Sequence, residues 1–277
     1  MSTGSIAIAD TNGRLLQCTE AVLPIYSLAK PFIASSVFST GVNIDAPVSN
    51  WIDEQVCPSS ADISVAQLLN HTSGLMDYFP LPDYQAAIRS GATPWSDEEF
   101  IERTLRKPLL FSPGERWSYS NPGYWLLSQI VQKQTGLDFD AVIQEFIATP
   151  LGLSSIHVAH GQFADDLPWY SAQWVWHGVI MSNALDVVKF MRSELVKPLL
   201  SNLTPVPVEH PLWTSPHSSY GLMVEPGVRY GHNGDGPGYS ASCFHFIESG
   251  LTGCVLMPAD KEGVAMEVLL EEIKQCH

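Results

Sequence analysis

The spacing of hydrophobic residues divides the chain into a short β-rich start, a helical middle and a β-rich end. Ser5–Ala9 alternates weakly between apolar and polar positions, and residues 10–14 carry the Asp, Asn and Gly that are typical of a turn. Hydrophobic residues resume at Leu15. This pattern predicts a β-hairpin.

The middle of the chain predicts a series of helices. One helical run extends from Ser27 to Phe38 and contains Pro31, which a helix tolerates only in its first turn. Ser27 is therefore expected at or just before the N-terminus of this helix. Further helices are predicted at 64–69, from 96 onward, and at 123–135, 138–147 and 184–195, with Ser64, Ser96 and either Ser182 or Asn183 as N-caps.

The last third of the chain returns to the β period. Residues 198–216 are rich in Pro and Ser and predict a loop, and residues 263–273 predict a closing helix. Because the first and last segments are both β-rich, we expect them to share one sheet in an α+β fold. Four strands are predicted between the loop and the last helix, at Tyr220–Val224, Val228–His232, Tyr239–Ile247 and Thr252–Met257.

Composition and charge restrict the classes of partner. The chain has 277 residues, of which 45% are hydrophobic and 16% charged, as in a folded globular protein. Fourteen Lys and Arg against 29 Asp and Glu give a formal net charge of −15. Such a surface repels phosphate backbones and anionic lipids, so neither nucleic acid nor a membrane is an expected partner.

Cysteine usage and the N-terminal residues favour a cytoplasmic location. The five cysteines are odd in number and form no CxxC pair, which favours free thiols. Residues 1–14 lack the basic and apolar regions of a secretory signal, and no stretch is apolar for long enough to span a bilayer. A leader removed from the sequence would change this expectation.

The first candidate for catalysis is Ser27-Leu-Ala-Lys30. On a helix, residues i and i+3 share a face, so Lys30 can contact the Ser27 hydroxyl. Burial and a helix N-terminus both lower the pKa of a lysine, and a neutral lysine can take the serine proton. An SxxK spacing arises by chance in such a chain about as often as not, and a solvated helix face is the alternative.

Two further segments carry candidate chemistry. A tyrosine near a lysine can act as a base when its phenol is partly ionised, which gives Tyr119 a role, and Asn121 can hydrogen-bond a substrate carbonyl and the lysine. A core tyrosine is the alternative. Gly231–Gly238 is dense in glycine, which lets a substrate backbone approach, and its His232 can orient substrate. A glycine-rich turn with a surface histidine is the alternative.

The order of these segments resembles the serine β-lactamase-like superfamily, most of all its branch of class C β-lactamases, D-aminopeptidases and esterases. The resemblance is most specific in residues 68–75, 113–136 and 230–239. It implies a β-lactamase/transpeptidase-like fold, with an antiparallel sheet flanked by helices and a mostly helical subdomain. A single catalytic unit is implied over residues 1–277, its α/β subdomain at about 1–26 and 205–277 and its helical subdomain at about 27–204.

The resemblance also implies roles for the matching positions. Ser27 would be the acylated nucleophile, Lys30 its partner and Tyr119 the base. The backbone N–H groups of Ser27 and Asp235 would form the oxyanion hole. Four positions would hold the substrate and the oxyanion: Asn121, His232, Gly234 and Asp235. The resemblance implies no cofactor.

Departures from the family pattern narrow the expected function. His232 stands where penicillin-recognising members usually have lysine, which weakens a fixed positive site for a carboxylate. Asp235 stands where a small residue is usual, and it can repel anionic substrates or hold an amine. The N-terminal part and the interval between Tyr119 and His232 are short for the family, which predicts a trimmed lid and a more open or differently shaped cleft. β-Lactam hydrolysis is therefore not the expected biological role.

The expected function is hydrolysis of a small-molecule ester, amide or peptide through an acyl-serine intermediate. Two alternatives stay open. An amine or alcohol that replaces water would make the protein an acyltransferase or cyclase of a biosynthetic pathway. A non-catalytic binding module of the same fold is the alternative of another class. The substrate, its stereochemistry and the oligomeric state are not predicted.

Other polar and aromatic clusters have weaker patterns. The residues His157, His160, Asp165, Asp166 and His177 lack the spacing of known zinc motifs, so a surface segment is favoured and no metal is expected. The tryptophans near Tyr170 predict an apolar acyl pocket or core packing equally well; they are Trp169, Trp174 and Trp176.

Overall fold

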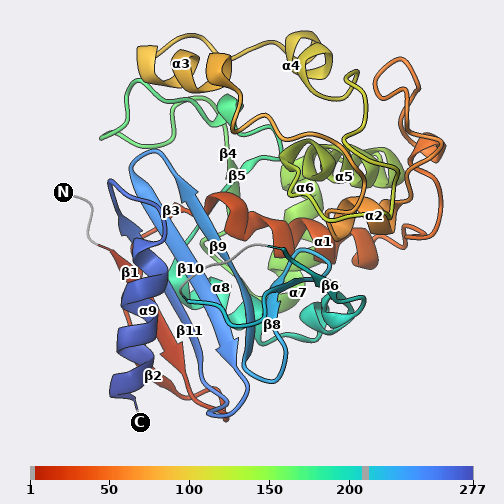
Figure 1. The fold of residues 1–277 in the computed structure, drawn as a ribbon. Coiled ribbons are helices and arrows are strands. Elements are labelled where there is room, and N and C mark those ends of the chain that lie inside the picture. The colour runs from red at the N-terminus through yellow and green to blue at the C-terminus, as the bar shows by residue number, and fades with distance from the viewer. Residues whose placement is uncertain (1–3, 208–211, 277) are drawn as a thin grey trace.

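The computed structural model, which describes residues 4–207 and 212–276, is built around one eight-stranded antiparallel sheet (Figure 1). The strand order is β2-β1-β11-β10-β9-β8-β7-β6, so the first and last strands of the chain, β1 and β11, are neighbours inside the sheet. The strands are β1 (Ser5–Ala9), β2 (Leu15–Cys18), β6 (Thr204–Pro205), β7 (His217–Ser218), β8 (Met223–Glu225), β9 (Arg229–Gly236), β10 (Tyr239–Phe246) and β11 (Thr252–Pro258).

The two ends of the chain pair directly, which confirms the predicted single sheet. β1 pairs with β11 from Ser5↔Leu256 to Ala9↔Thr252, and the predicted N-terminal hairpin forms between β1 and β2. The predicted strand at 220–224 starts later, at Met223, because residues 219–222 form a turn in which Gly221 has a φ of +75°. β9 extends past the prediction to Gly236, so the glycine-rich segment is mostly strand.

Helices cover both faces of this sheet. Alternate residues of β1 pack on opposite sides: Ile8 joins the apolar cluster under α9 (Val264–Gln275), whereas Ala7 and Ala9 join the main core. α8 (Ala184–Met191) packs against β1, β10 and β11 on the main-core side. α8 therefore belongs to the layers around the sheet, although its sequence position places it within the expected helical subdomain.

The remaining helices form a second body beside the sheet (Figure 1). The capping boxes predicted from Ser64 with Gln67 and from Ser96 with Glu99 are both present. The helices are α1 (Lys30–Ser39), α2 (Val65–Leu69), α3 (Pro82–Ser90), α4 (Asp97–Arg103), α5 (Asn121–Thr135), α6 (Phe139–Ile143) and α7 (Thr149–Leu151), with the short turns η1 (Tyr26–Ala29), η2 (Val48–Asn50), η3 (Gln144–Ala148), η4 (Ala172–Trp174) and η5 (Glu194–Leu200).

Several elements differ from the predicted ones. α8 ends at Met191 rather than at 195, and η5 follows it, so the predicted 198–216 loop begins in a helical turn; residues 208–211 of that loop lie outside the described residues. α3 was not predicted. Neither was a three-stranded sheet, in the order β3 (Leu23–Pro24), β5 (Val179–Ser182) and β4 (His157–Ala159). Its strands are too short for their period to be recognised.

Two further properties concern the chain as a whole. All five cysteines, at 18, 57, 243, 254 and 276, carry free thiols. Among the helices in residues 4–207 and 212–276, none combines the length and the apolar character that crossing a bilayer requires.

Candidate active site

Ser27 lies on η1, the tight turn that joins β3 to α1. The Ile25 N–H donates to the Ile180 carbonyl at 3.0 Å, which continues the pairing of β3 with β5 into the turn. Tyr26 has a φ of +43°, a strained value for a bulky residue, and its hydroxyl donates to the Pro237 carbonyl at 2.6 Å. These contacts hold Ser27 at the start of α1, as predicted from Pro31.

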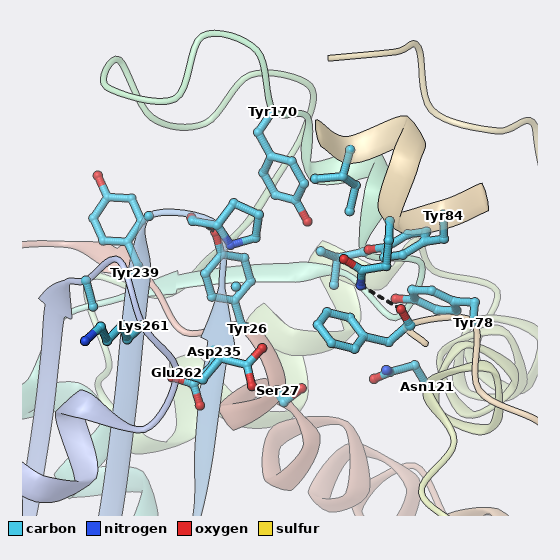
Figure 2. A pocket seen from close by; sticks show the side chains of 18 of the residues that line it. Tyr26, Ser27, Tyr78, Tyr84, Asn121, Tyr170, Asp235, Tyr239, Lys261 and Glu262 are labelled. Atoms are coloured by element: carbon cyan, nitrogen blue, oxygen red, sulfur yellow. Dashed lines mark hydrogen bonds between the residues drawn. The ribbon is translucent and has the colours of Figure 1, made fainter. Parts of the chain in front are cut away.

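β9 passes unusually close to this turn. A Cβ atom on Gly234 would lie 1.9 Å from the Ile25 carbonyl oxygen and 2.8 Å from the Leu28 nitrogen, so only glycine fits. This close approach places Asp235 and Ser27 on the wall of the same cavity (Figure 2).

Lys30 is completely buried at the start of α1. Its Nζ donates to Ser27 Oγ at 3.2 Å and to Asn121 Oδ1 at 2.7 Å, and it lies 4.8 Å from the centre of the Tyr119 ring. Burial lowers the pKa of Lys30 to about 7, against the opposing effect of the Asp77 carboxylate. A substantial fraction of Lys30 is therefore neutral near neutral pH.

Tyr119 precedes α5, and its hydroxyl donates to Ser27 Oγ at 2.9 Å. Burial, followed by the Asp77 and Asp235 carboxylates, raises the pKa of Tyr119 well above its usual value, although the hydrogen bond to Ser27 lowers it. The phenol is therefore neutral, which differs from the partly ionised tyrosine that sequence reasoning expected.

Asn121 begins α5 and connects Lys30 to a carboxylate. Its Nδ2 donates to Asp77 Oδ1 at 3.0 Å, and its backbone N–H donates to the same oxygen at 3.2 Å. The Tyr78 N–H also donates to Asp77 Oδ1, at 2.9 Å. Sequence reasoning missed Asp77, because a single Asp after the His71–Leu75 segment has no distinctive spacing.

The glycine-rich segment that contains His232 and Asp235 lies in β9, which passes beside the turn that carries Ser27. His232 is buried, and burial together with the charge of Lys30 lowers its pKa to about 3, so its ring is neutral. The Asp235 carboxylate accepts hydrogen bonds from Ser240 Oγ at 2.6 Å and from the Gly263 N–H at 2.9 Å. Asp235 lines the cavity beside Ser27 and His232 does not, and neither residue carries a positive charge.

His71 packs against the ring of Tyr119 and binds the backbone next to it. It is buried with a φ of +62°, its Nδ1 accepts the Ser120 N–H at 3.1 Å, and its ring centre lies 4.5 Å from that of Tyr119. The hydrogen bond fixes the segment that carries Tyr119, because it holds the backbone one residue further on.

A cavity of about 350 Å³ opens beside Ser27. Tyrosines from separate segments line it, with Trp169, and a mixed group of charges lies near β9 and the start of α9 (Figure 2). Trp174 and Trp176 pack in an aromatic cluster with Tyr84 and Trp95 instead. The labelled lining residues are Tyr26, Ser27, Tyr78, Tyr84, Asn121, Tyr170, Asp235, Tyr239, Lys261 and Glu262.

In the part of the chain that the structure describes, no group of three or more His, Cys, Asp or Glu side chains is placed to hold a metal ion. His157 lies exposed on β4, while His177 is buried and lines the cavity beside Ser27. Asp166 accepts a hydrogen bond from the Tyr239 hydroxyl at 2.7 Å. These residues are therefore dispersed over different parts of the surface and cavity.

Comparisons with known proteins agree on the family. A family model described as Beta-lactamase matches residues 9–275. Esterase EstB from Burkholderia gladioli is 30% identical over 150 residues, which are 48% of this chain and 38% of the esterase. A D-aminopeptidase from Brucella anthropi is 28% identical over 151 residues, which are 53% of this chain and 28% of that protein. The chain thus matches well under half the length of these relatives.

The fold is also similar to solved structures. The D-amino acid amidase from Ochrobactrum anthropi SV3 superposes with a TM-score of 0.78 over 99% of this chain and 95% of the amidase, at 20% identity. At this identity the likeness concerns the fold, an α+β arrangement with an antiparallel sheet flanked by helices.

Proposed function

The chain belongs to the beta-lactamase family, and from this premise we propose that it is a serine hydrolase that cleaves an ester or amide bond through an acyl-Ser27 intermediate. One observation carries the proposal. Ser27 Oγ lies 2.9 Å from the Tyr119 hydroxyl and 3.2 Å from Lys30 Nζ, on the wall of a cavity that can hold a small acyl group. The esterase and aminopeptidase names of its relatives support the same bond types.

The proton positions assign different roles to the two partners of Ser27. Lys30, with a pKa of about 7, is the base that takes the Ser27 proton as the hydroxyl attacks the substrate carbonyl carbon. Tyr119 keeps its proton and already donates toward Ser27 Oγ, so it can pass that proton to the leaving group when the tetrahedral intermediate collapses. Lys30 then returns its proton to Tyr119, and the same steps with water release the acyl group.

The oxyanion hole is proposed at the backbone N–H groups of Ser27 and Asp235. Gly236 and Tyr239 close a two-residue turn, so Asp235, opposite Ser240, occupies the next, non-hydrogen-bonded pair of the β9–β10 ladder. The Asp235 N–H therefore points away from β10. Pairing of β9 with β8 ends at Gly231, so among the described residues this edge faces η1 and Ser27.

The cavity favours an uncharged, apolar acyl group. Aromatic side chains form much of its wall, and neutral His232 provides no fixed cation for a carboxylate. Asp235, Asp260 and Glu262 outnumber Lys261 near the edge formed by β9 and the start of α9. We therefore propose small-molecule ester, amide or peptide substrates without an anionic acyl part.

A fluorophosphonate probe tests this proposal directly. The wild-type protein should gain the mass of one phosphonyl adduct, and Ser27→Ala should gain none while retaining its thermal unfolding temperature. Ser201→Ala, on a solvent-exposed serine, is the matched control and should label as wild type does. An unlabelled wild-type protein would instead favour the non-catalytic binding module.

Substrate and acceptor need a second measurement. A series of p-nitrophenyl esters and of D- and L-amino-acid amides identifies the preferred acyl group and its stereochemistry. Partition of the products between water and an added alcohol or amine then separates a hydrolase from an acyltransferase, because both use the same acyl-enzyme.

A further inference from the structure

Asp77 directs its carboxylate at the group that holds Lys30. Oδ1 accepts three hydrogen bonds, from Asn121 Nδ2, from the Asn121 N–H and from the Tyr78 N–H, and Oδ2 lies 3.3 Å from Asn121 Nδ2. The residue does not line the cavity beside Ser27, whereas Asn121 does. Any effect of Asp77 on the reaction is therefore transmitted through Asn121 and through its charge.

The carboxylate determines which way the Asn121 amide points. An ionised carboxylate can only accept hydrogen bonds, so the NH₂ end of the amide must face Asp77 and the carbonyl end must face Lys30. Lys30 Nζ donates to that carbonyl oxygen at 2.7 Å. A flipped amide would instead present its N–H groups to Lys30 and occupy the lone pair that has to accept the Ser27 proton.

The same carboxylate contributes the main charge near Lys30. The other titratable groups facing the amine stay neutral, because burial lowers the pKa of the histidines and raises that of the tyrosines. Burial raises the pKa of Asp77 on balance, although its hydrogen bonds to Asn121 and the charge of Lys30 lower it in part. The carboxylate accepts each hydrogen bond that its oxygens make with Asn121 and Tyr78, as an ionised group does. The neutral groups are His71, His177, His232, Tyr119 and Tyr124.

We propose that Asp77 is a positioning residue of this site, which orients the Asn121 amide so that neutral Lys30 keeps its lone pair available to accept the Ser27 proton. This inference rests on the proposed acyl-Ser27 chemistry. It gives Asn121 a function in the free enzyme, before any substrate binds: its carbonyl oxygen takes one N–H of Lys30 and leaves the lone pair free.

The test compares Asp77→Asn with Asp45→Asn, an exposed control on a surface turn. The acylation rate is measured from the burst of p-nitrophenol across pH 5 to 9, with thermal unfolding of each variant. Asp77→Asn should slow acylation about 10- to 100-fold, because its amide can face Asn121 either way. The rise in rate with pH should also move down by about one pH unit, because Lys30 loses the carboxylate that stabilises its charged form.

The outcomes separate this inference from the proposed function. If the wild-type protein shows neither a burst nor a phosphonate adduct, the acyl-Ser27 chemistry itself is wrong. If the wild type acylates and Asp77→Asn acylates at the same rate with the same pH profile, only the positioning role is wrong. Should Asp77→Asn not fold, Asp77→Glu decides: it keeps the charge, so its pH profile should match that of wild type, and a downward shift would contradict the proposal.

Discussion

Ser27 receives contacts from two side chains that differ in their readiness to accept a proton. Lys30 is buried and has a pKa of about 7, whereas burial holds Tyr119 in its protonated form. The SxxK spacing predicts that the first pair can meet, since i and i+3 share a helix face. It does not predict Tyr119, 92 residues away from Ser27, or the carboxylate of Asp77.

Lys30 should give the acylation rate a defined pH dependence. Only the neutral amine accepts the Ser27 proton, so the rate should rise as pH increases through about 7 and then level off. Lys30→Arg, which stays charged at all these pH values, should lower the acylation rate by about 10²- to 10⁴-fold. Lys107→Arg on the exposed surface is the control. A flat profile between pH 6 and 8 would argue against Lys30 as the base.

At the scale of elements, sequence patterns identify the larger pieces but not how they meet. The hairpin, the capped helices and the shared sheet follow from periodicity and end residues. β3, β4 and β5 do not, because two to four residues show no period. Yet β3 and β5 are the elements that hold η1 in place, so the positioning of Ser27 depends on contacts between distant segments.

The contact between β9 and η1 predicts the effect of one added methyl group. Gly234→Ala would place a Cβ 1.9 Å from the Ile25 carbonyl oxygen, so the turn carrying Ser27 has to move away from β9. We expect a loss of about 1–3 kcal/mol in the free energy of unfolding and a marked fall in the acylation rate. Gly123→Ala is the control, because its nearest atoms lie 3.7 Å away. If Gly234→Ala changed neither the free energy of unfolding nor the acylation rate, the close packing of β9 against η1 would be refuted.

At the scale of the whole molecule, the site forms where the sheet meets the helical body. The helical body supplies Lys30, Tyr119 and Asn121, while the sheet supplies His232 and Asp235 through β9. Because the two sides enclose Lys30, Tyr119 and His232, burial is the main cause of the shifts in their pKa values. The burial that lowers the pKa of Lys30 also keeps three histidines neutral, so the stability of the fold depends on pH.

Stability should fall as the pH drops below about 6.5. Burial holds the folded-state pKa values of His71, His177 and His232 below their unfolded value, so the unfolded chain binds more protons than the folded one below about pH 6.5. Unfolding therefore becomes more favourable as the pH decreases, and for His232 this continues to about pH 3. Each histidine contributes a slope of up to about 1.4 kcal/mol per pH unit in this window. Urea unfolding at pH 7 and at pH 5 measures this loss in the free energy of unfolding. His177→Leu should make the loss smaller, because one titrating group is removed.

His157→Leu, at an exposed position on β4, is the control and should leave the loss unchanged. An equal pH dependence of stability in wild type and His177→Leu would show that this histidine is not held neutral.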